Sequence, residues 1–121
     1  MAEPPRETGP AKRKSKQGPA ARLRKATIAA IQALVHSGSR PMVVPVFSGG
    51  VEIDGRRYLM GRAGASDLVC CFKGRFFALE LKAGRDVVSD AQKKFAMRVA
   101  QAGGVYVVVR QPQDAVDALM D

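Results

Sequence analysis

The chain of 121 residues contains no tryptophan, a single histidine and only two cysteines. His36 together with Cys70 and Cys71 cannot supply a zinc site of the usual cysteine and histidine spacing. The two cysteines are neighbours in an expected strand, where successive side chains point to opposite faces, so they should not bond to each other. We expect both to be small apolar strand residues of a protein kept in a reducing cytoplasm.

Long apolar runs are also lacking, since none approaches the ~20 residues that a membrane-spanning helix needs. Residues 1–17 are polar and basic, which is unlike the apolar core of a signal peptide. We therefore expect no membrane association and a cytoplasmic location. Hydrophobic residues make up 46% of the chain, which is ordinary for a globular protein and sufficient for one domain with a core.

Acidic residues are scarce near the N-terminus, because residues 1–25 contain only Glu3 and Glu7 against eight Lys and Arg. This segment therefore carries +6 of the formal net charge of +9. Residues 1–18 are rich in Pro, Gly, Lys and Ser, and we expect a disordered basic arm there, followed by a single domain over residues 19–121. A basic arm favours salt-sensitive binding to a phosphate backbone, and a solvated tail that aids solubility is the alternative. The candidates for DNA contact in this region are Lys12, Arg13, Lys14, Lys16, Arg22, Arg24 and Lys25.

The remaining chain predicts alternating helices and strands. Apolar spacing and turn residues indicate a helix over residues 20–37 with Gly38 as its C-cap, a strand over 41–47, a hairpin over 51–60 around Asp54-Gly55, a hairpin joined at Lys73-Gly74, a helix over 90–102, a strand over 105–109 and a helix over 113–120. This order predicts an α/β domain with a mixed β-sheet flanked by helices. Arg56, Arg57 and Arg62 come shortly before Asp67 and are either contacts for phosphate or an ordinary polar hairpin face.

The stretch over residues 64–82, GASDLVCCFKGRFFALELK, is the centre of this pattern. If Lys73-Gly74 forms a tight turn, opposed residues have numbers that sum to 147, and Asp67 falls opposite Glu80. Like charges opposed on neighbouring strands are destabilising. A divalent cation such as Mg²⁺ shared between the two carboxylates would replace this repulsion with binding. The small residues before Asp67, including Gly64, are expected to let the backbone run close to whatever binds there.

Lys82 belongs to the same surface as Glu80, because side chains two residues apart on a strand share a face. Leu79 and Leu81 then point to the other face. Two acids and a lysine on one surface outline a site for metal and phosphate. The simpler alternative is a lysine that only forms a salt bridge with the acids.

The segments Ser66-Asp67 and Glu80-Leu81-Lys82 resemble the motif of the PD-(D/E)XK nuclease superfamily. The resemblance extends to the small VRR-NUC nuclease domain, because Gln92 opens a helix that is followed by Gly103-Gly104 and a valine-rich strand ending in Arg110. It covers residues 61–119 approximately and implies a restriction-endonuclease-like core.

The resemblance also assigns roles to the residues. It implies Mg²⁺ or Mn²⁺ held by Asp67, Glu80 and the backbone carbonyl of Leu81, with Lys82 orienting the attacking water or stabilising the transition-state oxygens. It implies that Gln92 reaches toward the metal-bound water or the phosphate. Ser89 and Gln92 also match a helix capping box, so a purely structural role for Gln92 is the alternative.

In function, the resemblance implies a metal-dependent, structure-selective DNA endonuclease, most simply a homodimeric Holliday-junction resolvase of a bacterial or phage-infected cell. Its dimer interface is expected in residues 41–60, which are rich in apolar residues. The alternatives are a nuclease of flap or duplex DNA and a non-catalytic nucleic-acid-binding protein.

One departure from the family concerns the first helix, where its members commonly carry an acid that helps to bind metal. Residues 20–37 contain neither Asp nor Glu. Three interpretations stay open: Asp67 and Glu80 suffice alone, Glu52 or Asp54 assists them, or the activity is weak.

Overall fold

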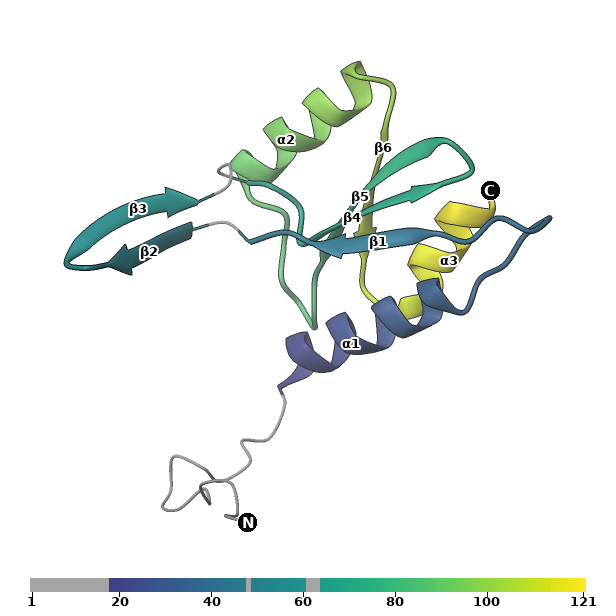
Figure 1. Cartoon of the computed structure of the whole chain (residues 1–121), viewed down its shortest axis with the longest axis horizontal. Coiled ribbons are helices and arrows are strands. Elements are labelled where there is room, and N and C mark those ends of the chain that lie inside the picture. Colours follow the sequence, from purple (N-terminus) through teal and green to yellow (C-terminus); the bar gives the residue numbers. More distant parts are fainter. Residues whose placement is uncertain (1–17, 48, 61–63) are drawn as a thin grey trace, which may run out of the picture.

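The computed structural model describes residues 18–47, 49–60 and 64–121. A four-stranded sheet in the order β1-β4-β5-β6 forms its centre and comprises β1 (Met42–Pro45), β4 (Leu68–Phe72), β5 (Arg75–Leu81) and β6 (Val105–Val109). β4 runs antiparallel to β1 and β5, whereas β6 runs parallel to β5. Together with three helices (Figure 1), this arrangement confirms the predicted α/β fold with a mixed sheet.

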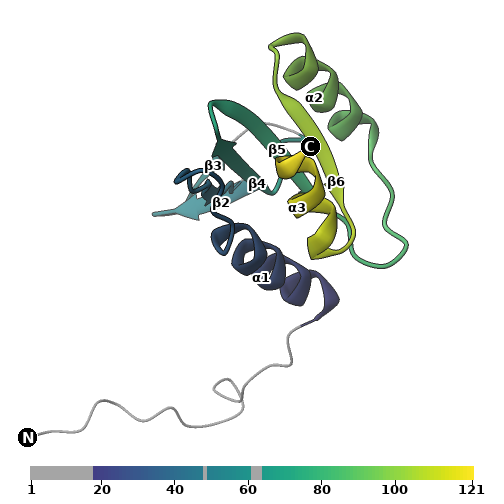
Figure 2. The same cartoon turned by 90° about the vertical axis from the view of Figure 1, so that its right-hand side faces the viewer.

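Helices cover both faces of the sheet. α1 (Pro19–Gln32) and α3 (Pro112–Met120) pack on one face, and α2 (Asp90–Gln101) connects β5 to β6 across the other. β6 consequently passes between α2 and α3 (Figure 2). The hydrophobic core lies under α1 and α3 and contains Leu23, Ile31, Leu68, Cys70, Phe72, Phe77, Leu79, Val109, Ala115 and Leu119.

α1 ends at Gln32, so the prediction of a helix to Ser37 with Gly38 as its C-cap was wrong. The chain instead forms a tight turn after the helix, in which Ser37 and Gly38 both have positive φ. The backbone groups of His36 and Ser39 bond to each other twice across this turn, at 2.9 Å each. Since left-handed residues cannot continue a right-handed helix, α1 has to end before this turn.

A second, smaller sheet consists of the hairpin β2 (Gly49–Ile53) and β3 (Arg56–Met60), which projects from the body of the molecule (Figure 1). Asp54 and Gly55 both have positive φ at its tip, as a type I′ turn requires, which confirms the predicted turn. The hairpin begins two residues earlier than predicted, because Gly49 and Gly50 already pair with Met60 and Leu59. The exposed guanidinium of Arg57 lies against Gly50, where a Cβ atom would only require this flexible side chain to move.

The two cysteines behave as predicted. Cys70 is buried, Cys71 is exposed, and both are free thiols. Burial, and secondarily the neighbouring Cys71, raises the pKa of Cys70 to about 11. Cys70 is therefore a protonated, apolar component of the core. In the described part of the chain, no helix has the length and apolar character to cross a membrane.

Candidate active site

The motif hairpin adopts the predicted register, since Phe72 pairs with Arg75 and Leu68 pairs with Leu79. Its turn is again of type I′, with positive φ at Lys73 and Gly74. Asp67 lies one residue before β4, at the end of the ladder. Its Oδ2 accepts a hydrogen bond of 2.8 Å from the backbone N–H of Leu81. Asp67 is thereby fixed beside the end of β5, next to Glu80.

Glu80 is a buried acid, with only 3% of its surface exposed. Its Oε2 accepts a hydrogen bond of 2.8 Å from the side-chain amide of Gln92 and lies 3.8 Å from Nζ of Lys82. Burial and then the charge of Asp67 raise the pKa of Glu80 to about 7, against the opposing influence of Lys82 and Tyr106. The structure thus brings together the predicted Asp67, Glu80, Lys82 and Gln92.

Gln92 caps α2, as the structural alternative predicted, and also contacts the buried acid. Its Oε1 accepts a hydrogen bond from the backbone N–H of Ser89 at 2.9 Å, and its own backbone N–H donates to Ser89 Oγ at 3.2 Å. These two bonds are the predicted capping box at the start of α2. The cap leaves the amide Nε2 to hold Glu80, so the helix end itself orients the buried acid.

Gly64 lets the chain run close to α2. Its φ is +76°, and a Cβ atom there would collide with the backbone carbonyl of Ala91 in the first turn of α2. The close approach at this position is therefore to α2. Ser66 is also buried, and its hydroxyl donates to the carbonyl of Leu68 at 3.1 Å. The segment before Asp67 is packed against the helix that carries Gln92.

Tyr106 is a site residue that the sequence analysis missed. It pairs with Ala78 in the parallel ladder and so shares the face of Glu80. Its ring packs edge-on against Phe95, with the ring centres 6.4 Å apart. Burial, followed by the charges of Glu80 and Asp67, raises the pKa of Tyr106 to about 12, so its hydroxyl stays protonated. Had the strand over residues 105–109 been expected to pair in parallel with the strand over residues 75–81, Tyr106 could have been placed near Glu80.

The site fits a hard divalent cation such as Mg²⁺ or Mn²⁺. Oε1 of Glu80 is buried without a hydrogen-bond partner, which is costly unless another group binds it. Asp67 is held through Oδ2 and stands beside this acid. Two carboxylates are the usual protein contribution to a magnesium site, with water and phosphate completing the shell. Within residues 18–47, 49–60 and 64–121, no three His, Cys, Asp or Glu side chains gather as a metal site.

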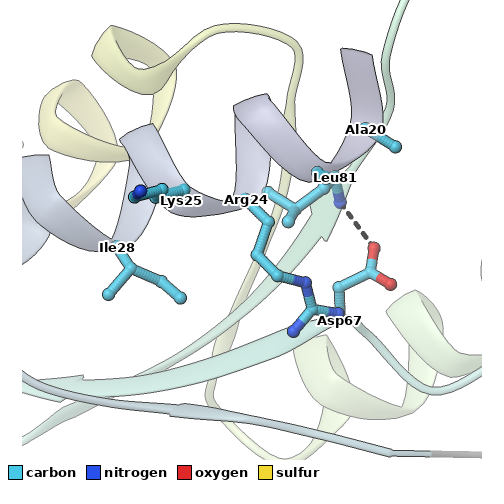
Figure 3. A pocket seen from close by; sticks show the side chains of 7 residues that line it. Ala20, Arg24, Lys25, Ile28, Asp67 and Leu81 are labelled. Atoms are coloured by element: carbon cyan, nitrogen blue, oxygen red, sulfur yellow. Dashed lines mark hydrogen bonds between the residues drawn. The ribbon is translucent and has the colours of Figure 1, made fainter. Parts of the chain in front are cut away.

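A pocket of about 470 Å³ opens beside Asp67, between α1 and the end of β5 (Figure 3). Of the predicted DNA contacts, Arg24 and Lys25 line this pocket together with Asp67 and Leu81. Arg24 extends from the helix toward Asp67 (Figure 3). Arg22 is exposed on the same helix but does not line the pocket.

The other predicted DNA contacts are not brought to this pocket. Arg56 and Arg57 are exposed at the outer end of the projecting hairpin, where Arg57 lies over Gly50. Glu52, paired with Arg57 in the ladder, and Asp54 form no acidic cluster with Asp67 and Glu80, so the described residues do not support their assistance in metal binding. Lys12, Arg13, Lys14, Lys16 and Arg62 lie outside the described residues.

The sequence was compared with protein-family models and with curated proteins. No protein-family model matches the sequence. No curated protein matches it at a significant level.

Proposed function

We propose that this protein is a metal-dependent, structure-selective DNA endonuclease of the cytoplasm, related to the VRR-NUC domains. The observation that carries the proposal is the environment of Glu80, a buried acid with one oxygen held by Gln92 and Lys82 and the other left without a partner. Burying a carboxylate next to Asp67 costs stability in the metal-free protein. A divalent cation binding to both acids offsets this cost.

Each residue contributes a defined step to phosphodiester hydrolysis. Asp67 and Glu80 would hold Mg²⁺ or Mn²⁺, with the carbonyl of Leu81 as a further ligand. A cation bound there would lower the pKa of a coordinated water and offset charge on the phosphate. Lys82 is 12% exposed in its side chain, and its ammonium orients the attacking water or donates to a phosphate oxygen. The water oxygen would bond to phosphorus, the bond to the leaving sugar oxygen would break, and one proton of the water would end on that leaving oxygen, so that one water is consumed.

Gln92 and Tyr106 position the acid and have no role in proton transfer. The amide of Gln92 fixes Oε2 of Glu80. Tyr106 lies beside Glu80 as a protonated hydroxyl and favours its ionised form, which is the form that binds a cation. Such partners of metal ligands set both orientation and affinity.

The proposed substrate selection depends on contacts with the DNA backbone. The basic residues on α1 suit contacts with phosphates, which fix the position of DNA without reading its sequence. Recognition of branched DNA by shape is therefore the preferred form of the proposal. A four-way junction has two scissile strands, and cutting both requires two copies of the single Asp67 and Glu80 pair.

A homodimer is accordingly part of the proposal, with its interface on β1 and the β2–β3 hairpin. This region exposes a group of large apolar side chains: Met42, Val44, Phe47, Ile53 and Tyr58. Val43, which was also expected at the interface, packs against the core instead. Symmetric pairing of an apolar surface is the commonest route to a dimer.

A cleavage assay tests this function. The substrates are a four-way junction, a flap, a duplex and a single strand, each incubated with Mg²⁺, with Mn²⁺ and with EDTA. We expect cleavage only with metal and most rapidly on the junction. Cleavage confined to flap or duplex DNA would favour the corresponding nuclease, and DNA binding without cleavage in either metal would favour a non-catalytic binding protein.

Light scattering at micromolar concentration tests the dimer. We expect the mass of two chains, and we expect Tyr58→Glu to yield monomers because it places a charge on an apolar interface. Arg22→Glu, a charge change on the exposed side of α1, is the control that should remain dimeric. A monomeric wild-type protein that cuts only one strand of the junction would contradict the dimer.

A further inference from the structure

The pocket beside Asp67 contains the feature that carries a further inference. Its α1 wall is formed by residues 20, 21, 24, 25 and 28, which have the i, i+4 spacing of one helix face. This is the face of α1 turned toward Asp67 and the end of β5. A metal ligand contributed by α1 would have to stand on it. None of its five residues is acidic, and two of them, Arg24 and Lys25, are cations.

The charge balance of the site follows from this wall. Asp67 and Glu80 together carry −2 when both are ionised, which matches one divalent cation. The described residues provide no third carboxylate, histidine or cysteine in the same group. A second divalent cation would lack protein ligands on the α1 side and would stand close to the guanidinium of Arg24. At separations of a few ångströms, such like charges repel each other by several kcal/mol at a protein surface.

Arg24 is positioned to bind an anion in that place. It is partly buried, and its side chain reaches from α1 toward Asp67 (Figure 3). Even so, no ion pair links it to a carboxylate among the described residues. The hydrogen bond to Oδ2 of Asp67 comes instead from the backbone N–H of Leu81. Ala20, one turn earlier on the same face, lines the same pocket. The donors of Arg24 are thus directed into a pocket and not consumed by a salt bridge.

The beginning of α1 adds to the positive potential of the pocket. Gly18 provides no side-chain cap, and the first turn contains no acid, so the free N–H groups and the helix dipole are not neutralised. A guanidinium offers two parallel N–H donors to two phosphate oxygens. Phosphate is therefore the ligand that matches this pocket in both charge and shape.

We propose that Arg24 supplies the second positive charge of the active site, so that the protein binds one divalent cation and grips the scissile phosphate between that cation and the Arg24 guanidinium. This inference rests on the proposed nuclease function and identifies how the site operates without an acid on α1. Lys25, which lines the same pocket but is exposed, contacts a flanking phosphate as a point charge.

Calorimetric titration with Mn²⁺ and single-turnover cleavage of a junction test the proposal. The wild-type protein is expected to bind one Mn²⁺ per chain. Arg24→Gln is expected to keep that stoichiometry while lowering the cleavage rate at saturating Mn²⁺ by about 10²–10³-fold, the usual loss for a donor to a developing oxyanion. Lys25→Gln is the matched control, because it removes the same charge from the same pocket. It should reduce cleavage less than about tenfold, since it acts only through the field of an exposed charge.

Arg24→Lys keeps the charge and most of the side chain, so it guards against a folding defect in Arg24→Gln. We expect an intermediate loss of cleavage, because an ammonium cannot form the paired contact. Two Mn²⁺ per wild-type chain, or equal cleavage by the Arg24→Gln and Lys25→Gln proteins, would overturn the role of Arg24 while leaving the nuclease function intact. A protein that binds no Mn²⁺ and cleaves nothing would overturn the proposed function itself.

Discussion

The two hairpins of this protein share a turn geometry and differ in almost everything else. Both close with an X-Gly pair in which both residues have positive φ, at Asp54-Gly55 and at Lys73-Gly74. The β4–β5 hairpin lies within the main sheet, and Phe77 and Leu79 are completely buried in it. The β2–β3 hairpin forms its own sheet and leaves Ile53 and Tyr58 exposed. The turn therefore fixes the strand register, whereas helices packed on the strands decide which hairpin can hold a buried acid.

Each hairpin carries a glutamate near a cation, which makes the comparison testable. Glu80 is buried near Lys82, and Glu52 is exposed and paired with Arg57 in the ladder. We expect Glu80→Gln to reduce cleavage by roughly 10³-fold or more, because it removes a ligand of the catalytic cation. Glu52→Gln should leave cleavage unchanged. DNA affinity, measured by fluorescence anisotropy, should be equal or higher in Glu80→Gln, since a charge that repels phosphate is lost. Equal cleavage by the two variants would contradict the metal site.

Apolar truncations sharpen the same comparison in terms of stability. Phe77→Ala should lower the free energy of unfolding by about 3–5 kcal/mol, because it leaves a cavity in the core. Ile53→Ala, on the exposed hairpin, should change it by less than about 0.5 kcal/mol in the monomeric state. Urea unfolding at low protein concentration measures both. A large loss in Ile53→Ala under those conditions would show that the β2–β3 hairpin is covered within the chain itself.

The sequence predicted the β4–β5 hairpin well because its information is local. A tight turn at Lys73-Gly74 and a side-chain period of two suffice to place Asp67 near Glu80 and Lys82 on the same face. Gln92 was named as a site residue through the family resemblance, and its capping box with Ser89 was recognisable because it extends over only four residues. The predicted α/β class also follows from the order of the elements along the chain.

Longer-range placements were not available from the sequence. Tyr106 joins the site through the parallel pairing of β5 and β6, and its contact with Glu80 depends on that register. Arg56 and Arg57 were grouped with the site by proximity in the chain, but the β2–β3 hairpin carries them to its outer end. The end of α1 was misjudged because Leu34 and Val35 continue the apolar pattern, although the turn at Ser37-Gly38 interrupts the helix.

The buried glutamate should also give the metal-free protein an unusual pH dependence. The pKa of Glu80 rises from 4.5 to about 7 on folding. Between these values the folded state retains a proton that the unfolded state has lost, so stability falls as the pH rises from 4.5 to 7 and is level above 7. The expected loss is at most about 3 kcal/mol. Thermal unfolding in EDTA measures it. Glu80→Gln should remove this decline and Glu52→Gln should keep it, whereas a decline that persists in Glu80→Gln would assign it to another group.

The two tyrosines of the chain allow the smallest and most specific test. Tyr106→Phe deletes only a buried hydroxyl that has no hydrogen-bond partner within normal distance, so the stability in EDTA should be unchanged or slightly higher. The same hydroxyl favours the ionised form of Glu80. Its removal should therefore weaken Mn²⁺ binding at pH 7 by up to about tenfold, as for other partners of metal ligands. At pH 9 the wild-type protein and the variant should bind Mn²⁺ alike, because Glu80 is then ionised in both.

Tyr58→Phe makes the same chemical change on β3, where the side chain is 44% exposed and remote from the acids. Mn²⁺ titrations of this variant should match those of the wild-type protein at both pH values. Two outcomes would contradict an action through the ionisation of Glu80. One is an equal loss of Mn²⁺ affinity in both variants, and the other is a loss in Tyr106→Phe that is as large at pH 9 as at pH 7. A loss of Mn²⁺ affinity restricted to Tyr106→Phe at pH 7 would instead show that β6 contributes to the site. The hydroxyl on this strand would then be controlling the charge of an acid on β5.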